Sequence, residues 1–293
     1  MHAIHTDSSA TRSQIRRKIM SEVSEYKEAG RLLIEKLRLY TDPVAIKYIR
    51  DISEIPDQAH RPSSQGQKWA LCQAFTYARR HRMHVAMTSD DNFCVPATAG
   101  HRWEYVPEED LIESQVRQGW HKDRDAEEKK FAFAKKGVGE ENYERMAEFK
   151  GFVCSPLADT IVIPDSILIY GDGVQITHIV QALTYEHKYP VTSSFEGFGE
   201  SCQKGGLMPF LTGKPQVVIP GMGDRAFSGT TESEIAIGIP GSLVFYVLDN
   251  LFKSGGRLNI GQPVRTVLPN NITERITPGF SFMYDKMQEY KNR

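Results

Sequence analysis

The chain has 293 residues, 40% of them hydrophobic and 25% charged, as in a globular protein of one large or two ordinary domains. The 36 Lys and Arg residues nearly balance the 37 Asp and Glu residues, which argues against nucleic acid or an acidic membrane surface as a partner. No apolar run approaches the ~20 residues that span a bilayer, and residues 1–20 contain no apolar signal core. The sequence therefore predicts a cytoplasmic protein.

The first third of the chain alternates predicted helices and strands. Residues 1–12 are polar and are expected to be disordered, whereas residues 13–40 show helical spacing that Gly30 is expected to interrupt. Asp42-Pro43 ends this pattern before the apolar strand 44–49. After a Pro- and Ser-rich loop, a helix over 67–80, a strand over 81–88 and a turn over 89–92 lead to Cys94.

The rest of the chain predicts a charged helical excursion followed by more mixed structure. Residues 103–151 are rich in charge, and a solvated helical layer is favoured there over a lid that carries Trp103, Trp120 and Phe131. Further strands are predicted in 160–170, 191–195, 216–219 and 234–239, and helices over 174–187, 242–253 and 283–290. This alternation predicts an α/β or α+β fold.

A short internal match predicts two related halves. Gln73–Tyr77 returns as Gln181–Tyr185 and Cys94 returns as Cys202, in both cases 108 residues later. The predicted organisation is a first half over 13–102, a helical insertion over 103–151, a second half over 152–258 and an extension over 259–293. A duplicated unit of this kind predicts two pseudo-symmetric halves with a site between them.

The four cysteines are the main candidates for chemistry. With no export signal, they are expected to be thiols, metal ligands or a nucleophile rather than disulfides. Cys72, Cys94 and Cys202 form the candidate ligand set for an iron–sulfur cluster, although no CxxC or CxxH spacing marks a metal site. Three thiolates leave one iron of a four-iron cluster free to act as a Lewis acid. A cysteine nucleophile beside a histidine is the alternative.

A second candidate site is the glycine-bearing segment 221–227. Its backbone N–H groups and Arg225 are suited to binding a carboxylate or phosphate, so Asp224 and Arg225 are predicted catalytic residues. Substrate binding is assigned to Ser193, Ser194, Gly223 and Arg225. The structural alternative is a loop joining two strands, closed by an Arg–Asp ion pair. No GxGxxG or GxxxxGK[ST] fingerprint supports nucleotide binding.

Several motifs together resemble one family, the domain-of-unknown-function family 169, also called uncharacterised ArCR. They lie between about residues 30 and 255 and comprise ALCQAFTYAR, Asp91–Cys94, Ile167–Tyr170, Val191–Ser194, Pro220–Arg225 and Ile239–Pro240. The resemblance implies shared positions at Cys72, Cys94, Cys202 and Gly223–Arg225, and an anaerobic setting that suits an oxygen-sensitive cluster. Cys154 matches no family cysteine, which favours three ligands over four. Other members often carry cysteines where this chain has Gly171 and Gly221.

The leading hypothesis is an enzyme of anaerobic metabolism that uses the cluster as a Lewis acid, of the lyase, dehydratase or desulfurising type. Its predicted partner is a small anionic substrate, for which an aromatic body is one option; a homo-oligomer stays open. The alternatives are a cytoplasmic module that binds a metabolite or haem without catalysis, and a cysteine-nucleophile hydrolase or transferase.

Overall fold

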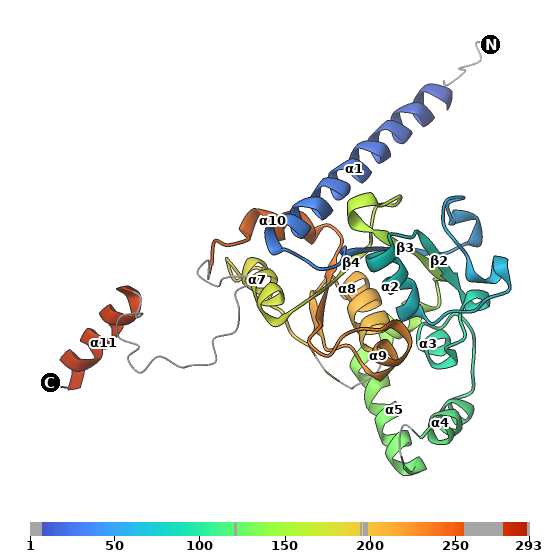
Figure 1. Cartoon of the computed structure of the whole chain (residues 1–293). Coiled ribbons are helices and arrows are strands. Elements are labelled where there is room, and N and C mark those ends of the chain that lie inside the picture. Colours follow the sequence, from blue (N-terminus) through green and yellow to red (C-terminus); the bar gives the residue numbers. More distant parts are fainter. Residues whose placement is uncertain (1–7, 120–121, 194, 196–198, 255–277, 292–293) are drawn as a thin grey trace, which may run out of the picture. The chain divides into compact units, whose positions relative to one another are not determined.

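The computed structural model describes residues 8–119, 122–193, 195, 199–254 and 278–291. The chain divides into two compact units, Met1–Ile260 and Gly261–Arg293. The first unit contains the sheet (Figure 1). The second contains helix α11 (Pro278–Lys291), which spans the predicted helix 283–290.

The sheet of the first unit has six strands that pair only in antiparallel fashion. They are β1 (Val44–Ile49), β2 (Val85–Thr88), β3 (Gly151–Pro156), β4 (Ser166–Gly171), β5 (Gln216–Val218) and β6 (Ile235–Pro240). Their order is β2-β3-β1-β4-β6-β5, with β1 and β4 paired at the centre. The fold is therefore of mixed helix and strand, as predicted, and its antiparallel sheet makes it α+β.

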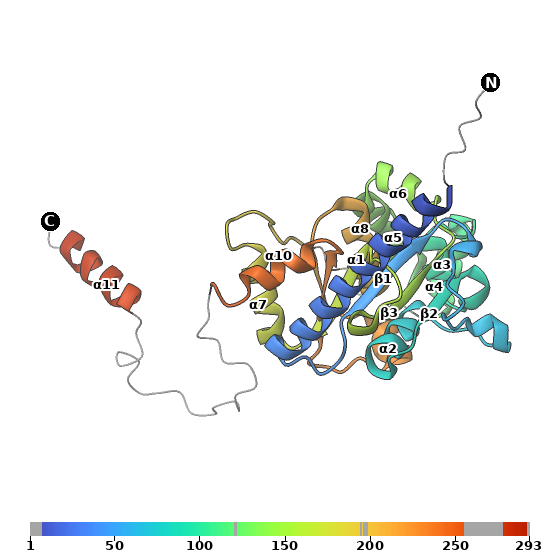
Figure 2. The ribbon, with the colours of Figure 1, turned by 90° about the horizontal axis from the view of Figure 1, so that it is seen from above.

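Helices cover both faces of this sheet (Figures 1 and 2). One face packs against α1 (Ser8–Leu37), α7 (Gly173–Leu183) and α10 (Leu243–Asn250). The other face packs against α2 (Leu71–His81), the π-helical segment η5 (Glu200–Leu207) and α8 (Met208–Thr212). Successive side chains of a strand point to opposite faces of the sheet. Val44 and Ile46 therefore pack on the side of α2, whereas Ala45 packs on the side of α1.

The predicted helical excursion is confirmed. It contains α4 (Glu108–Arg117), α5 (Arg124–Val138) and α6 (Glu140–Met146), and it leads into β3. Trp103 is buried against Phe152, with ring centroids 5.8 Å apart, and so belongs to the core. Short 3-10 turns η1 (Ile52–Glu54) and η2 (Pro62–Gln65) shape the predicted loop after β1, and η3 (Ser89–Asp91) and η4 (Leu157–Asp159) follow β2 and β3.

The N-terminal helix is longer than predicted. It begins at Ser8, so only residues 1–7 of the expected disordered segment lie outside the described residues, and it continues through Gly30 to Leu37. A Cβ at position 30 would lie 2.5 Å from the backbone nitrogen of Ala158. Gly30 is therefore a packing residue that lets η4 approach α1, rather than a helix breaker.

Several predicted boundaries were wrong for local reasons. Trp69 is paired with Asn92 in an isolated bridge, so α2 begins at Leu71 rather than at the predicted residue 67. Residues 160–163 form no strand, because the Thr160 hydroxyl hydrogen-bonds both the N–H and the carbonyl oxygen of Val162. The described residues of 191–195 are irregular, and strand β3 was not predicted.

The 108-residue repeat does not correspond to equivalent positions in the structure. Gln73–Tyr77 lies near the start of α2, whereas Gln181–Tyr185 spans the end of α7 and the turn after it. Cys94 precedes a short helix, while Cys202 lies inside η5. Pseudo-symmetry of the two halves therefore stays a prediction.

Two glycines let η5 lie directly on the sheet. A Cβ at Gly238 in β6 would lie 1.9 Å from the carbonyl oxygen of Gly205, a distance that no side chain tolerates. A Cβ at Gly205 would in turn lie 2.7 Å from the Leu168 side chain. This close approach fixes the depth at which η5 places Cys202.

Candidate cysteine site

Cys72, Cys94 and Cys202 come from three separate elements on one face of the sheet. Cys72 is in the first turn of α2, Cys94 is the residue before α3 (Val95–Gly100), and Cys202 is in η5. Burial raises the pKa of the Cys202 thiol, and the charges of Asp224, Cys72 and Cys94 raise it further. The three thiols and Asp224 therefore share one neighbourhood, which we call the cysteine site.

Contacts between distant segments hold this site together. The Cys72 thiol donates to the carbonyl oxygen of Gly223 at 3.7 Å, and His101 Nε2 lies 3.3 Å from the carbonyl oxygen of Cys202. The backbone N–H of Cys94 donates to the side-chain oxygen of Asn92 at 3.1 Å. Each cysteine is thus positioned by its backbone or its thiol, and all three are partly exposed.

Asp224 lies in a helix rather than in the predicted loop. Its Oδ2 accepts the N–H of Gly221 at 3.1 Å and so caps α9 (Met222–Ser228). Only 6% of the residue is exposed, and this burial raises the pKa of its carboxyl despite the opposing influence of Ser201. The opposing influence consists of hydrogen bonds from the side chain and the backbone of Ser201 to this carboxyl.

Arg79, not Arg225, is the arginine whose charge reaches Asp224. It lies seven residues after Cys72, on the same side of α2, and is 1% exposed. Its guanidinium stacks over the Tyr170 ring at 4.1 Å and forms an ion pair with Glu234. Sequence reasoning missed Arg79 and Tyr170, although the spacing of Cys72, Thr76 and Arg79 could have identified this side of the helix.

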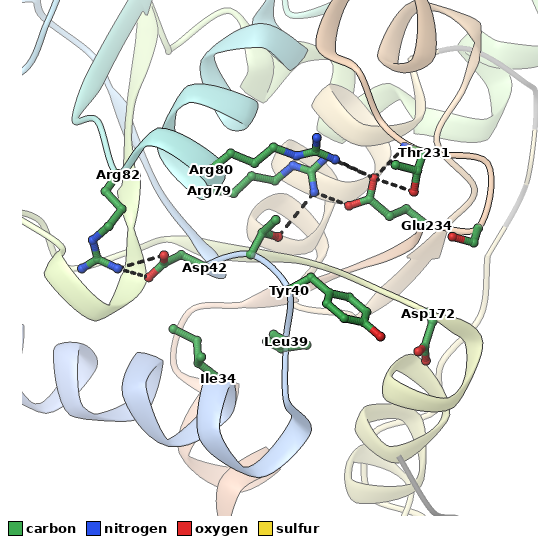
Figure 3. Close-up of a pocket in the computed structure, with 12 residues that line it drawn as sticks. Ile34, Leu39, Tyr40, Asp42, Arg79, Arg80, Arg82, Asp172, Thr231 and Glu234 are labelled. Atoms are coloured by element: carbon green, nitrogen blue, oxygen red, sulfur yellow. Dashed lines mark hydrogen bonds and ion pairs between the residues drawn. The ribbon is translucent and has the colours of Figure 1, made fainter. Parts of the chain in front are cut away.

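An open cavity of about 550 Å³ lies at the other end of α2 (Figure 3). Its arginines are paired within the protein: Arg80 contacts Glu234 at 3.1 Å, and Arg82 contacts Asp42 at 2.8 Å. Asp172 at its edge caps α7. These ion pairs join the C-terminal end of α2 to the residues just before β1 and β6.

No described hydrogen bond places the other predicted site residues in the cysteine site, except for Gly223. One nitrogen of Arg225 donates to the carbonyl oxygen of Thr231 at 2.7 Å in an exposed contact, so there is no Arg225–Asp224 ion pair among the described contacts. Gly223 contacts Cys72, whereas no hydrogen bond described here joins Ser193 to the cysteine site. Ser194 lies outside the described residues. Cys154 is fully buried in β3 and contributes to none of the pKa shifts of the other three thiols.

In the described parts of the chain, no group of three His, Cys, Asp or Glu side chains is arranged to hold a metal ion. No described helix combines the length and apolar character needed to cross a membrane.

The comparisons identify relatives but no activity. The chain is 26% identical over 221 residues to the uncharacterized protein MJ0308 of Methanocaldococcus jannaschii. The aligned region covers 75% of this chain and 90% of that protein. No solved structure matches. The model of the DUF169 family, described as uncharacterised ArCR, matches residues 32–250. The chain therefore belongs to the DUF169 family of uncharacterised ArCR proteins.

Proposed function

We propose that Cys72, Cys94 and Cys202 hold an iron–sulfur cluster in an enzyme that acts on a small anionic molecule. The observation that supports this proposal is that the Cys72 thiol contacts Gly223, next to Asp224, and that the charges of Asp224, Cys72 and Cys94 all raise the pKa of Cys202. Three cysteines this far apart in the sequence are not expected to be neighbours in the folded protein by chance. Cys154, by contrast, is fully buried in β3, as expected of a cysteine that packs as a small hydrophobic residue.

The electrostatics favour metal ligation over nucleophilic catalysis. Burial raises the pKa of Cys72, Cys94 and Cys202, whereas reactive cysteines have a lowered pKa and an electropositive surrounding. Iron would reverse this effect, because a metal cation stabilises the thiolate.

A cluster held by three thiolates would supply a Lewis-acidic iron that polarises a hydroxyl, carbonyl or sulfur of the substrate, which suits a lyase, dehydratase or desulfurising reaction. The protein's own residues would orient that substrate. Asp224 is the carboxyl of the site, and hydrogen bonds from Ser201 hold it in place. Arg225 Nη1 donates to the carbonyl oxygen of Thr231 in an exposed contact, and its guanidinium would also bind the substrate's anion.

The test is the iron, acid-labile sulfide and visible spectrum of full-length protein purified without oxygen. We expect about four irons and four sulfides per chain with broad visible absorbance. Cys94→Ala should lose this content, and Cys154→Ala should keep it, with circular dichroism showing that both variants fold. Native protein without iron, or Cys94→Ala with full iron and sulfide, would remove the assignment.

A further inference from the structure

The N-terminal half of α1 extends beyond the part of the helix that packs on the sheet. The packed part buries one stripe of side chains, each at most 8% exposed: Tyr26, Ala29, Leu33 and Leu37. No residue from 18 to 25 is buried. Figure 1 shows this half of the helix leading away from the sheet. The family model matches residues 32–250, so the shared fold does not account for this half.

The apolar stripe of α1 continues past the sheet. Counting back from Tyr26 in steps of three or four residues reaches Val23 and then Ile19, which is 47% exposed. Met20 beside it is 64% exposed. Most of the stability of a helix in a protein comes from packing of its apolar face, and an isolated helix of a few turns is marginal in water. A partner that covers the exposed stripe would therefore stabilise this half of α1.

The charges of this half are divided into two blocks on either side of Ile19. Residues 12–18, the basic block, contain three arginines, one lysine and no acidic residue. Residues 22–28, the acidic block, contain three glutamates and one lysine. The described contact between the blocks is an exposed Lys18–Glu22 pair at 4.0 Å, and exposed pairs of this kind contribute little. The helix dipole also disfavours cations near the start of a helix, so the basic block favours an acidic partner.

A second copy of the same helix, running antiparallel, matches both the stripe and the charges. With Ile19 of both copies at the two-fold axis, residue 16 of one copy is opposite residue 22 of the other. The sequence has Arg16 and Glu22 at these positions, so opposite charges meet in both halves of the pair. A parallel pair would set each block against itself. A polyanion such as nucleic acid would match the basic block but be repelled by the acidic one.

We propose that two copies of this chain associate through residues 13–25 of α1, as an antiparallel helix pair centred on Ile19. The overlap is about 20 Å long, at ~1.5 Å per residue, and it ends before Tyr26, where the protomer's own sheet covers the stripe. Such a contact is smaller than the ~800 Å² per partner of a standard interface, so the dimer is weak, with a Kd of roughly 10 μM. This association does not depend on the chemistry of the cysteine site.

Sedimentation velocity of the full-length protein at increasing concentration tests the association. Native protein should pass from monomer to dimer as its concentration rises through about 10 μM. Ile19→Glu should raise the Kd more than about tenfold, because it sets two carboxylates together at the axis. Arg16→Glu and Glu22→Lys should each raise it about tenfold, since each creates like charges across the antiparallel pair. An equal mixture of these two variants should dimerise as the native protein does, because the mixed pair restores opposite charges.

Glu35→Lys is the matched control, because Glu35 is exposed on the same helix outside the overlap. It should dimerise as the native protein does, and circular dichroism should show that every variant folds. Protein that stays monomeric up to ~100 μM, tenfold above the expected Kd, would overturn the inference. A dimer that Ile19→Glu leaves intact, or a mixture that does not recover, would also overturn it. Monomeric protein that binds anionic lipid vesicles through the basic block would assign this half of α1 to a membrane surface instead.

Discussion

The thiol of Cys72 donates to the carbonyl oxygen of Gly223 across 151 residues of sequence. This contact joins the first turn of α2 to the first turn of α9, next to Asp224. Beside it, Thr76 donates to the carbonyl oxygen of Ser228 at 3.0 Å, so the two helices are held together along one side. The site therefore depends on how α2 and α9 lie against each other.

Cysteine alkylation tests the state of the thiols in metal-free protein. Burial raises the pKa of Cys72 and Cys202, and iodoacetamide reacts with the thiolate. At pH 7 both residues should be labelled more than about tenfold more slowly than in urea-unfolded protein, since each unit of pKa lowers the thiolate fraction about tenfold. Peptide mapping by mass spectrometry measures this. Rapid labelling of folded protein at pH 7 would revive the nucleophile hypothesis.

Arg79→Met tests the buried ion pair behind the site. Removal of the guanidinium leaves the Glu234 carboxylate, which is 12% exposed, with Arg80 as its cationic partner and Thr231 as a hydrogen-bond donor. It also removes the stacking on Tyr170. We expect a loss of about 3–5 kcal/mol in the free energy of unfolding, measured by urea denaturation. The double variant with Glu234→Gln should recover part of this loss. Additive losses in the double variant would mean that the pair is not coupled.

Asp91 should make stability depend on pH. Burial raises the pKa of its carboxyl, but hydrogen bonds from Ser63, Thr88 and Arg61 outweigh this effect and leave the pKa below its ordinary value. A group with a depressed pKa contributes stability above its unfolded value of about 3.9, and this contribution disappears as the pH falls through the folded pKa.

Asp91→Asn should therefore cost about 3 kcal/mol at pH 7 and make the unfolding free energy less dependent on pH below about 4. Urea denaturation at pH 7 and at pH 3 measures both effects. Asp90→Asn is the control, because Asp90 is exposed in the same turn. If the Asp91 and Asp90 variants have the same pH profile, the carboxyl of Asp91 does not hold the turn before Cys94.

Gly238→Ala tests the close packing of η5 on β6. The added Cβ would collide with the carbonyl oxygen of Gly205, so we expect a loss of more than about 3 kcal/mol or a failure to fold. Gly173→Ala is the control: its Cβ would have no neighbour within 4 Å, and the effect should be below about 0.5 kcal/mol. Thermal unfolding of the two variants separates them. A small, equal effect would show that η5 moves away without cost.

The sequence by itself determined the local features of this protein. Apolar periodicity and turn residues predicted the strand Val44–Ile49, the helix around Cys72 and the helical excursion, because hydrophobic patterning and Gly, Pro and Asp signals act over a few residues. The motifs also identified the family. The cysteines and Asp224 were selected from residue chemistry, the internal match and the family resemblance.

Only the tertiary structure decided which of these residues meet. The gathering of Cys72, Cys94, Cys202 and Asp224 depends on long-range strand pairing and on glycine contacts such as Gly205–Gly238, neither of which leaves a periodic trace in the sequence. Burial distinguishes Arg79, whose charge reaches Asp224, from Arg225, which makes an exposed contact, although both are arginines with equal chemistry. Local patterns specify elements, whereas packing across the chain specifies the site.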